Sequence, residues 1–164
     1  MNSTAEKVAE GLAGLLRDAF GRTGEARVLV APDPATGLEL LAAGKPGGFS
    51  VVVFYDSDAP NDPGTVDFDG IVDAELTVGV AAHPGLSAQE TRKAPAVLAF
   101  AGRVRAAVCG AEPEGVLDGY VYRGMQQVRA VDGTLMRGYA LRFGATYAFG
   151  EPETGAGGDA QAAG

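Results

Sequence analysis

The stretch from Thr134 to Phe149 reads TLMRGYALRFGATYAF, and it decides the fold. Its odd positions carry mostly large side chains and its even positions mostly small ones, which is the two-residue period of a β-strand. Sixteen residues in this conformation would span about 50 Å, far more than the usual strand of about five or six residues. A strand this long is typical of proteins that build assemblies or barrels.

The segment before it completes a hairpin. Gly119–Val131 alternates in the same way, and Asp132-Gly133 between the two segments is a preferred pair for a two-residue type I′ turn. Such a turn pairs residues whose numbers sum to 265. The predicted pairs are Tyr122 with Phe143, Gly124 with Leu141, and Gln126 with Tyr139. The face of the last strand that carries its large side chains is then expected to meet Tyr120, Tyr122 and Val128.

The same register places Arg123 directly opposite Arg142 on the other face of the hairpin. Like charges at opposite positions destabilise a sheet. Either the two long side chains splay into water, or this face awaits carboxylates from another subunit.

Three further strands and two main helices are expected upstream. Ala26–Ala31 and the nearly all-apolar Phe49–Tyr55 read as strands, and so does Ile71–Ala82, whose residues 72, 74, 76, 78 and 80 share an apolar face. The helices are expected at Thr4–Phe20, capped by Thr4 without a capping box, and at Ser87–Cys109, with a Ser87/Glu90 capping box and a kink at Pro95. The second helix is expected to bury Val97, Leu98, Ala101, Val104 and Val108.

The remaining segments are expected to connect or to be loose. Pro34–Ala43 reads as a short helix, Asp56–Thr65 as an acidic loop and Glu112–Leu117 as a linker. The pattern predicts an α+β fold, in which a mixed, mainly antiparallel sheet of four to five strands packs on two main helices with a long C-terminal β-hairpin. We expect a single domain over residues 1–150 and a disordered, Gly/Ala-rich tail over residues 151–164.

Composition limits the classes of function. The 164 residues include 13 Lys or Arg and 21 Asp or Glu, so the net charge of −8 disfavours nucleic-acid binding. Seven acids and no base lie between Asp56 and Glu75, whereas eight bases and four acids lie between Arg92 and Arg142. A single cysteine, Cys109, allows no internal disulfide and favours an intracellular origin. No apolar run is long enough to cross a membrane, and the N-terminus does not read as a signal peptide.

No residue pattern indicates catalysis, a cofactor or a metal. His83 ends a strand before Pro84, and Cys109 is expected to be a buried free thiol. Asp56-Ser57-Asp58 starts like a calcium loop but continues into Pro60. Gly44-Lys45-Pro46 lacks the Ser or Thr of a phosphate-binding loop. We therefore expect no enzyme, no cofactor and no metal site.

The order of elements from residue 4 to 149 resembles the tail terminator (tail completion) proteins of long-tailed bacteriophages and of phage-like particles such as gene transfer agents. The stretch from Gly138 to Phe149 is similar to the amphipathic terminal strand of that family. The resemblance implies a hexameric ring that caps the tail tube, stops its polymerisation and meets the head connector. It implies as partners the chain itself, a tail tube protein and a head connector protein, with DNA passing through the lumen and no membrane. It also implies a place in the tail of a virion or phage-like particle assembled in the bacterial cytoplasm.

The uneven charge suggests how such a ring associates, because each subunit of a cyclic ring offers two different faces. The hypothesis is that an acidic segment of one subunit meets a basic face of the next. The acids are Asp56, Asp58, Asp62, Asp67 and Asp69, and the bases are Arg103, Arg105, Arg123, Arg129 and Arg142. Three alternatives stay open: a solvated acidic loop or one that lines the lumen, another head–tail joining or tail tube protein, and a small α+β ligand-binding or enzymatic domain.

Overall fold

The computed structural model describes residues 3–43, 48–62, 64, 70–82, 93–128 and 137–148. Within them, five strands form one sheet in the order β1-β2-β3-β5-β4, in which only the β1–β2 pair is parallel. The strands are β1 (Ala26–Ala31), β2 (Phe49–Pro60), β3 (Ile71–Ala82), β4 (Val116–Val128) and β5 (Arg137–Ala148). The helices are α1 (Thr4–Leu16) with its π-helical extension η1 (Arg17–Gly21), α2 (Pro34–Ala42) and α4 (Lys93–Cys109). The expected α+β class, with a mainly antiparallel sheet and a C-terminal hairpin, is confirmed.

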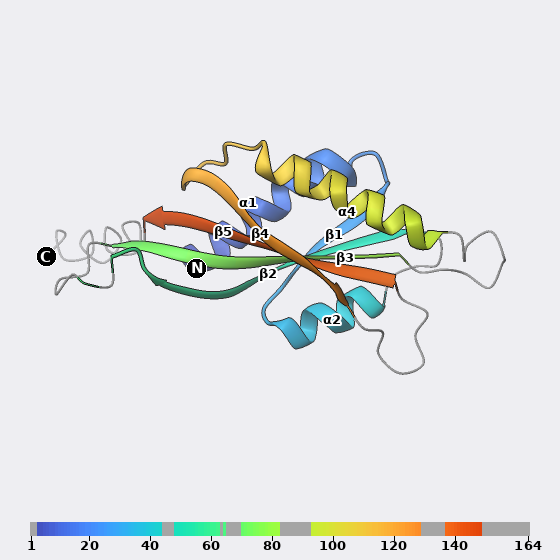
Figure 1. Cartoon of the computed structure of the whole chain (residues 1–164), viewed down its shortest axis with the longest axis horizontal. Coiled ribbons are helices and arrows are strands. Elements are labelled where there is room, and N and C mark those ends of the chain that lie inside the picture. The colour runs from blue at the N-terminus through green and yellow to red at the C-terminus, as the bar shows by residue number, and fades with distance from the viewer. Residues whose placement is uncertain are drawn as a thin grey trace, which may run out of the picture.

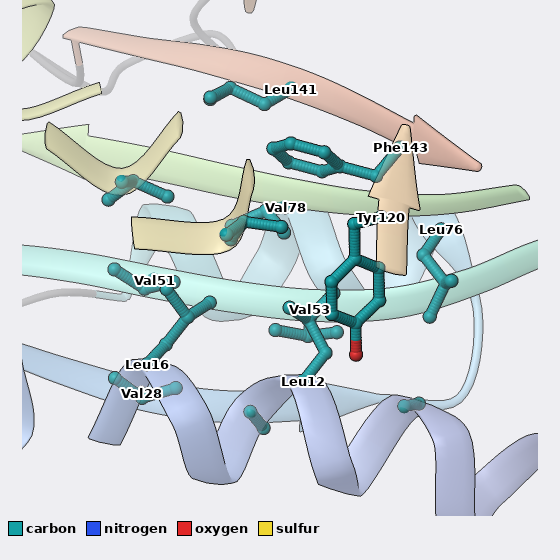
Figure 2. Close-up of a cluster of buried hydrophobic side chains, with 14 of the residues drawn as sticks. Leu12, Leu16, Val28, Val51, Val53, Leu76, Val78, Tyr120, Leu141 and Phe143 are labelled. Atoms are coloured by element: carbon teal, nitrogen blue, oxygen red, sulfur yellow. The ribbon is translucent and has the colours of Figure 1, made fainter. Parts of the chain in front are cut away.

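The helices lie on both faces of the sheet, but unequally. Figure 1 shows α1 and α4 together over one face, and of the described helices only α2 lies on the other. The main core fills the first layer, where Leu141, Phe143 and Tyr147 of β5 are fully buried. Figure 2 shows Leu12 and Leu16 of α1 pointing from below into this cluster. The predicted apolar face of β3, residues 72, 74, 76, 78 and 80, is confirmed as buried.

The start of α1 differs from the expectation by one residue. Ser3 is the N-cap, and its Oγ accepts a hydrogen bond from the Glu6 backbone N at 3.2 Å. The Glu6 Oε2 accepts from the Ser3 backbone N at 2.6 Å, so a capping box exists and Thr4 is not the cap. These bonds from Ser3, the backbone bond first, hold the pKa of Glu6 below its usual value.

The strand β2 is longer than predicted. It runs on to Pro60 through a bulge between Tyr55 and Ser57, so the prediction of an acidic loop from Asp56 is wrong for its first five residues. The reason is tertiary, because β3 offers continuous pairing as far as Pro60 with Val72. Backbone pairing therefore outweighs the turn preference of the Asp, Ser and Pro side chains.

The helix α4 starts its described course at Lys93, and its predicted cap at Ser87 lies outside the described residues. Pro95 falls in the first described turn of α4, and a missing N–H is tolerated in the first turn of a helix. Leu98 is 46% exposed, so the prediction that it is buried is wrong. Phe100 is buried instead, and its ring packs against Phe20 and Phe49. The other predicted stripe residues, Val97, Ala101, Val104 and Val108, are confirmed as buried.

The register of the β4–β5 hairpin agrees with the prediction at Tyr122 and differs from Gly124 onward. Tyr122 does pair with Phe143, but a bulge then shifts the pairing by one residue, so Gly124 pairs with Arg142 and Gln126 with Ala140. Gly124 has φ +127°, a conformation that favours glycine, which makes the bulge possible. The shift moves Val128 onto the α2 side, so its expected contact with the large face of β5 is wrong. The predicted Asp132-Gly133 turn lies outside the described residues, as do residues 151–164.

The buried ring of Phe143 gives a test of the core. Phe143→Ala should lower the free energy of unfolding by about 3–5 kcal/mol, because it removes a fully buried ring and leaves a cavity. Urea titration measures the change. Leu98→Ala removes a half-exposed side chain and should cost well under half as much; equal losses would contradict the assigned core.

Candidate assembly surface

The second face of the sheet is only partly covered. The short helix α2 packs where Ala31, Leu41, Val52 and Ala81 are buried. Beyond it the same face is polar, and we call that region the open sheet face. It comprises Asp56, Ser57, Asp73, Glu75, Thr77, Arg123, Arg142 and Thr146. A shallow hollow of about 510 Å³ in this face is lined by Asp56, Ser57, Glu75, Tyr122, Arg123 and Arg142.

Neutral donors hold two carboxylates of the open sheet face, those of Asp56 and Asp73. Thr77 Oγ1 donates to Asp56 Oδ2 across the β2–β3 pair. Asp73 Oδ1 accepts from Thr146 Oγ1 at 2.5 Å, and both its oxygens accept from Asn61 Nδ2, at 3.1 and 3.2 Å. The bonds from Thr146 and then Asn61 lower the pKa of Asp73. These hydrogen bonds therefore fix both carboxylates in position, and the lowered pKa of Asp73 favours its charged form.

Arg123 does not face Arg142 as the sequence predicted. It occupies the bulge between Tyr122 and Gly124, and its Nε reaches Glu75 at 2.9 Å. The guanidinium lies over Gly144, where an added Cβ would come within 2.5 Å of Nε and 2.7 Å of Nη2. The absence of a side chain at Gly144 thus lets Arg123 cross β5 to its partner on β3.

A double-mutant cycle tests this arrangement. Gly144→Ala should destabilise the chain by roughly 0.5–1 kcal/mol, because the methyl group displaces Arg123 from Glu75 and the lost pair is partly exposed. In an Arg123→Ala background the same change should be neutral or stabilising, since alanine suits a strand better than glycine. Urea titration of the four chains gives the coupling, and additive effects would refute the contact.

The predicted interface arginines separate into two groups. Arg103 on α4 forms a two-point ion pair with Glu25, with Nη2 to Oε2 at 2.9 Å, and its Cζ lies 5.3 Å from the Phe20 ring centre. The bond to Glu25 raises the pKa of Arg103. Arg105 lies 5.3 Å over the Tyr122 ring. Arg103 and Arg105 therefore lie on α4, on the side of the sheet that α1 and α4 cover, whereas Arg123 and Arg142 lie on the open sheet face.

Arg142 differs from Arg123, the other arginine of the open sheet face, because it forms no ion pair with a described residue. It is exposed on β5, and among the described residues it has no ion-pair partner. It lines the same hollow as Asp56 and Arg123, so the structure brings these three predicted interface residues together.

The described members of the predicted acidic segment, Asp56, Asp58 and Asp62, lie in the second half of β2 or just after it. Asp58 accepts from the Tyr55 hydroxyl on the α1 side of the sheet, and Asp62 accepts from the Gly64 backbone N at 3.1 Å. Asp67, Asp69 and Arg129 lie outside the described residues.

A tyrosine relay on the α1 side was missed by sequence reasoning. The Tyr55 hydroxyl donates to Asp58 Oδ2 at 2.6 Å, and the Tyr147 hydroxyl lies 2.7 Å from that of Tyr55, which leaves Tyr147 as the donor of this bond. Burial first, then the bonds to Asp58 and Tyr147, raise the pKa of Tyr55. The relay joins β2 to β5 across β3. Residues 55 and 147 are 92 positions apart, and neither lies in a motif that would indicate the contact.

Tyr120 contrasts with this pair. Its ring points from β4 toward α1 (Figure 2), and its buried hydroxyl meets no hydrogen-bond partner among the described residues. Burial raises the pKa of Tyr120 to about 12.

The two tyrosines therefore predict opposite effects for the same substitution. Tyr55→Phe should lower the free energy of unfolding by about 1–3 kcal/mol, because it removes a bond to a charged acceptor. Tyr120→Phe should be neutral or stabilising, since it removes a buried hydroxyl without a described partner. Urea titration of both variants decides the matter; a larger loss at Tyr120 would contradict the assignment.

The structure also bears on the cysteine and on the possible metal ligands considered in the sequence. Cys109 is exposed at the end of α4, so the expected buried thiol is wrong; the buried stripe ends one residue earlier, at Val108. His83 lies outside the described residues. In the described part of the chain no three His, Cys, Asp or Glu side chains group as metal ligands. Among the described helices, none is long and apolar enough to cross a membrane.

The known proteins to which the chain is similar are solved structures. No protein-family model matches the chain, and no curated protein does. The chain is similar to one in a solved structure described as "Virion of native gene transfer agent (GTA) particle", with 21% identity, 84% of each chain covered and a TM-score of 0.44. A likeness of this size assigns no family, so the function has to be inferred from the chain's own sequence and surfaces.

Proposed function

We propose that this chain is a structural subunit of a phage or phage-like particle, such as a gene transfer agent. In this role it caps the tail tube as a homohexameric ring, stops tube polymerisation and joins the tube to the head connector. The observation that carries the proposal is the sheet built around β5, a twelve-residue strand that is paired along its whole length with β3 and bordered by β4. This is the terminal hairpin on which the resemblance to tail terminators rests.

The interface we propose is electrostatic. An acidic segment (Asp56, Asp58, Asp62, Asp67 and Asp69) of one subunit faces arginines (Arg103, Arg105, Arg123, Arg129 and Arg142) of the next. Support comes from the described acids, because Asp56, Asp58 and Asp62 are all held by neutral donors and have no cation partner among the described residues. Of the described arginines in this set, Arg142 is the one on the open sheet face without an ion pair to a described residue, so it can pair with such acids of a neighbouring subunit. Complementary charges of this kind mainly set orientation and partner choice.

The remaining parts of the proposal follow from the ring. Its partners are copies of itself, the tail tube protein and the head connector protein, and DNA passes through the lumen without specific binding. The chain acts by association and not as an enzyme, needs no cofactor or metal, and has no membrane role. Its place is the tail of the particle, which is assembled in the bacterial cytoplasm.

The experiment that tests this function is tube capping. The chain is added to growing tubes of the tail tube protein from the same particle, and tube lengths are measured by negative-stain electron microscopy. Tubes should stay short and carry a ring at one end, because the cap occupies the growing end. Arg142→Glu should weaken capping, whereas Lys7→Glu on the exposed side of α1 should not.

Two outcomes would overturn the proposal. Unlimited growth of the chain by itself would identify a tube protein. Unchanged tube lengths, together with a ligand-induced rise in melting temperature, would identify a ligand-binding or enzymatic domain.

A further inference from the structure

The two outer strands of the sheet differ in how their free edges are treated. At β1, Arg17 Nε donates to the Val28 carbonyl oxygen at 3.4 Å, and Glu10 holds the same arginine at 3.2 Å. At β4, no side chain among the described residues bonds to the main chain between Tyr120 and Val128. An edge with available backbone donors and acceptors is a template for another strand.

The free edge of β4 also carries exposed apolar side chains. Of the described large hydrophobic residues that are exposed, three lie on this strand: Leu117 at 43%, Val121 at 55% and Met125 at 36%. The run from Tyr120 to Val128 contains one arginine and no carboxylate. In a chain with a net charge of −8, the stretch Tyr120–Val128 therefore presents exposed apolar side chains and no negative charge, and the one carboxylate of β4, Asp118, precedes it.

A second unpaired edge lies at the other end of the sheet order. The strand β1 stops opposite Phe54, while β2 continues to Pro60, so among the described strands Tyr55–Pro60 has a neighbour only on its β3 side. Beside it is a groove of about 500 Å³, which we call the β2 slot. It is lined by Ala5, Glu6, Ala9, Glu10, Val30, Ala31, Pro32 and Tyr55. Its walls are mainly small apolar side chains, and its rim is acidic.

We propose that β4 of one copy of this chain enters the β2 slot of the next copy and extends its sheet. The inference rests on the proposed ring, and it assigns the contact between neighbouring subunits of that ring to β4 and the β2 slot. Within one copy β2 and β4 run in opposite directions, because three antiparallel pairs separate them. Rotation about an axis along the strands keeps these directions, so the pairing between copies is antiparallel.

Side chains and charges fit this pairing. Met125 pairs with Leu141 and so lies on the α1 and α4 side of the sheet, the side on which Ala5 and Ala9 line the slot. Glu6 and Glu10 line the slot, and Asp58 accepts a hydrogen bond from Tyr55 at its wall, whereas the stretch Tyr120–Val128 of the incoming strand brings Arg123 and no acid. Because two different edges meet, the contact is heterologous, and repetition of it generates a ring when the rotation closes.

Cysteine pairing tests the contact directly. In a Cys109→Ser background, chains with Ser57→Cys are mixed with chains that carry Val121→Cys and oxidised mildly. Ser57 and Val121 both lie on the open side of the sheet, since they pair with Glu75 and Gly144. Mixed disulfide dimers should form several-fold faster than in a mixture in which Leu98→Cys replaces Val121→Cys, because Leu98 is a comparably exposed apolar position on α4, at 46% against 55%. No excess of mixed dimers would overturn the proposal.

Each cysteine variant alone is the second control. If Val121→Cys chains join to each other as fast as to Ser57→Cys chains, the edge pairs with itself about a two-fold axis, and the proposal is wrong.

A charge on the edge gives an independent readout. Met125→Glu should raise the dissociation constant of the assembly roughly tenfold or more, because a carboxylate then enters an acidic slot. Leu98→Glu should leave it unchanged, and circular dichroism checks that both chains fold. Equal assembly of both variants would contradict the proposal. If mixed disulfides grow into open ladders and no closed ring forms, the strand pairing stands and the capping function fails.

Discussion

The structure depends on the burial of one face of β5. Leu141, Phe143 and Tyr147 are fully buried between the sheet and the α1/α4 layer, so their alternation fixes which side of every neighbouring strand points inward. A shift of one residue would turn this face toward solvent. The large side chains of β5 pack in the core, so the residues on its outer face can be small. The missing side chain at Gly144 leaves room for Arg123 to reach Glu75.

The surface is then shaped by bulges. The bulge in β2 after Tyr55 places Asp56 beside Thr77 on the open sheet face and Asp58 beside Tyr55 on the other. The bulge in β4 carries Arg123 away from Arg142 and toward Glu75. Local changes of register thus determine which charges are satisfied within the chain and which face outward, as Arg142 does.

Sequence reasoning located the strands well, because hydrophobic period and length both point to them. Ala26–Ala31 and Ile71–Ala82 have the predicted bounds, and the buried face of β3 is the predicted one. It failed where tertiary pairing decides, as in the extension of β2 to Pro60 and the shifted half of the hairpin. Of the candidate interface, the sequence identified the charged residues but not their roles: Arg103 and Arg123 are bound within the chain, and the slot beside β2 follows only from where β1 ends.

The central claim is that this sheet is a unit of a closed assembly. Light scattering after size exclusion, across a concentration series at low and high salt, tests it most directly. We expect one closed species of about six subunits that weakens as salt screens the charged contacts. A chain that stays monomeric at every concentration and salt, or that grows without limit, would contradict the claim.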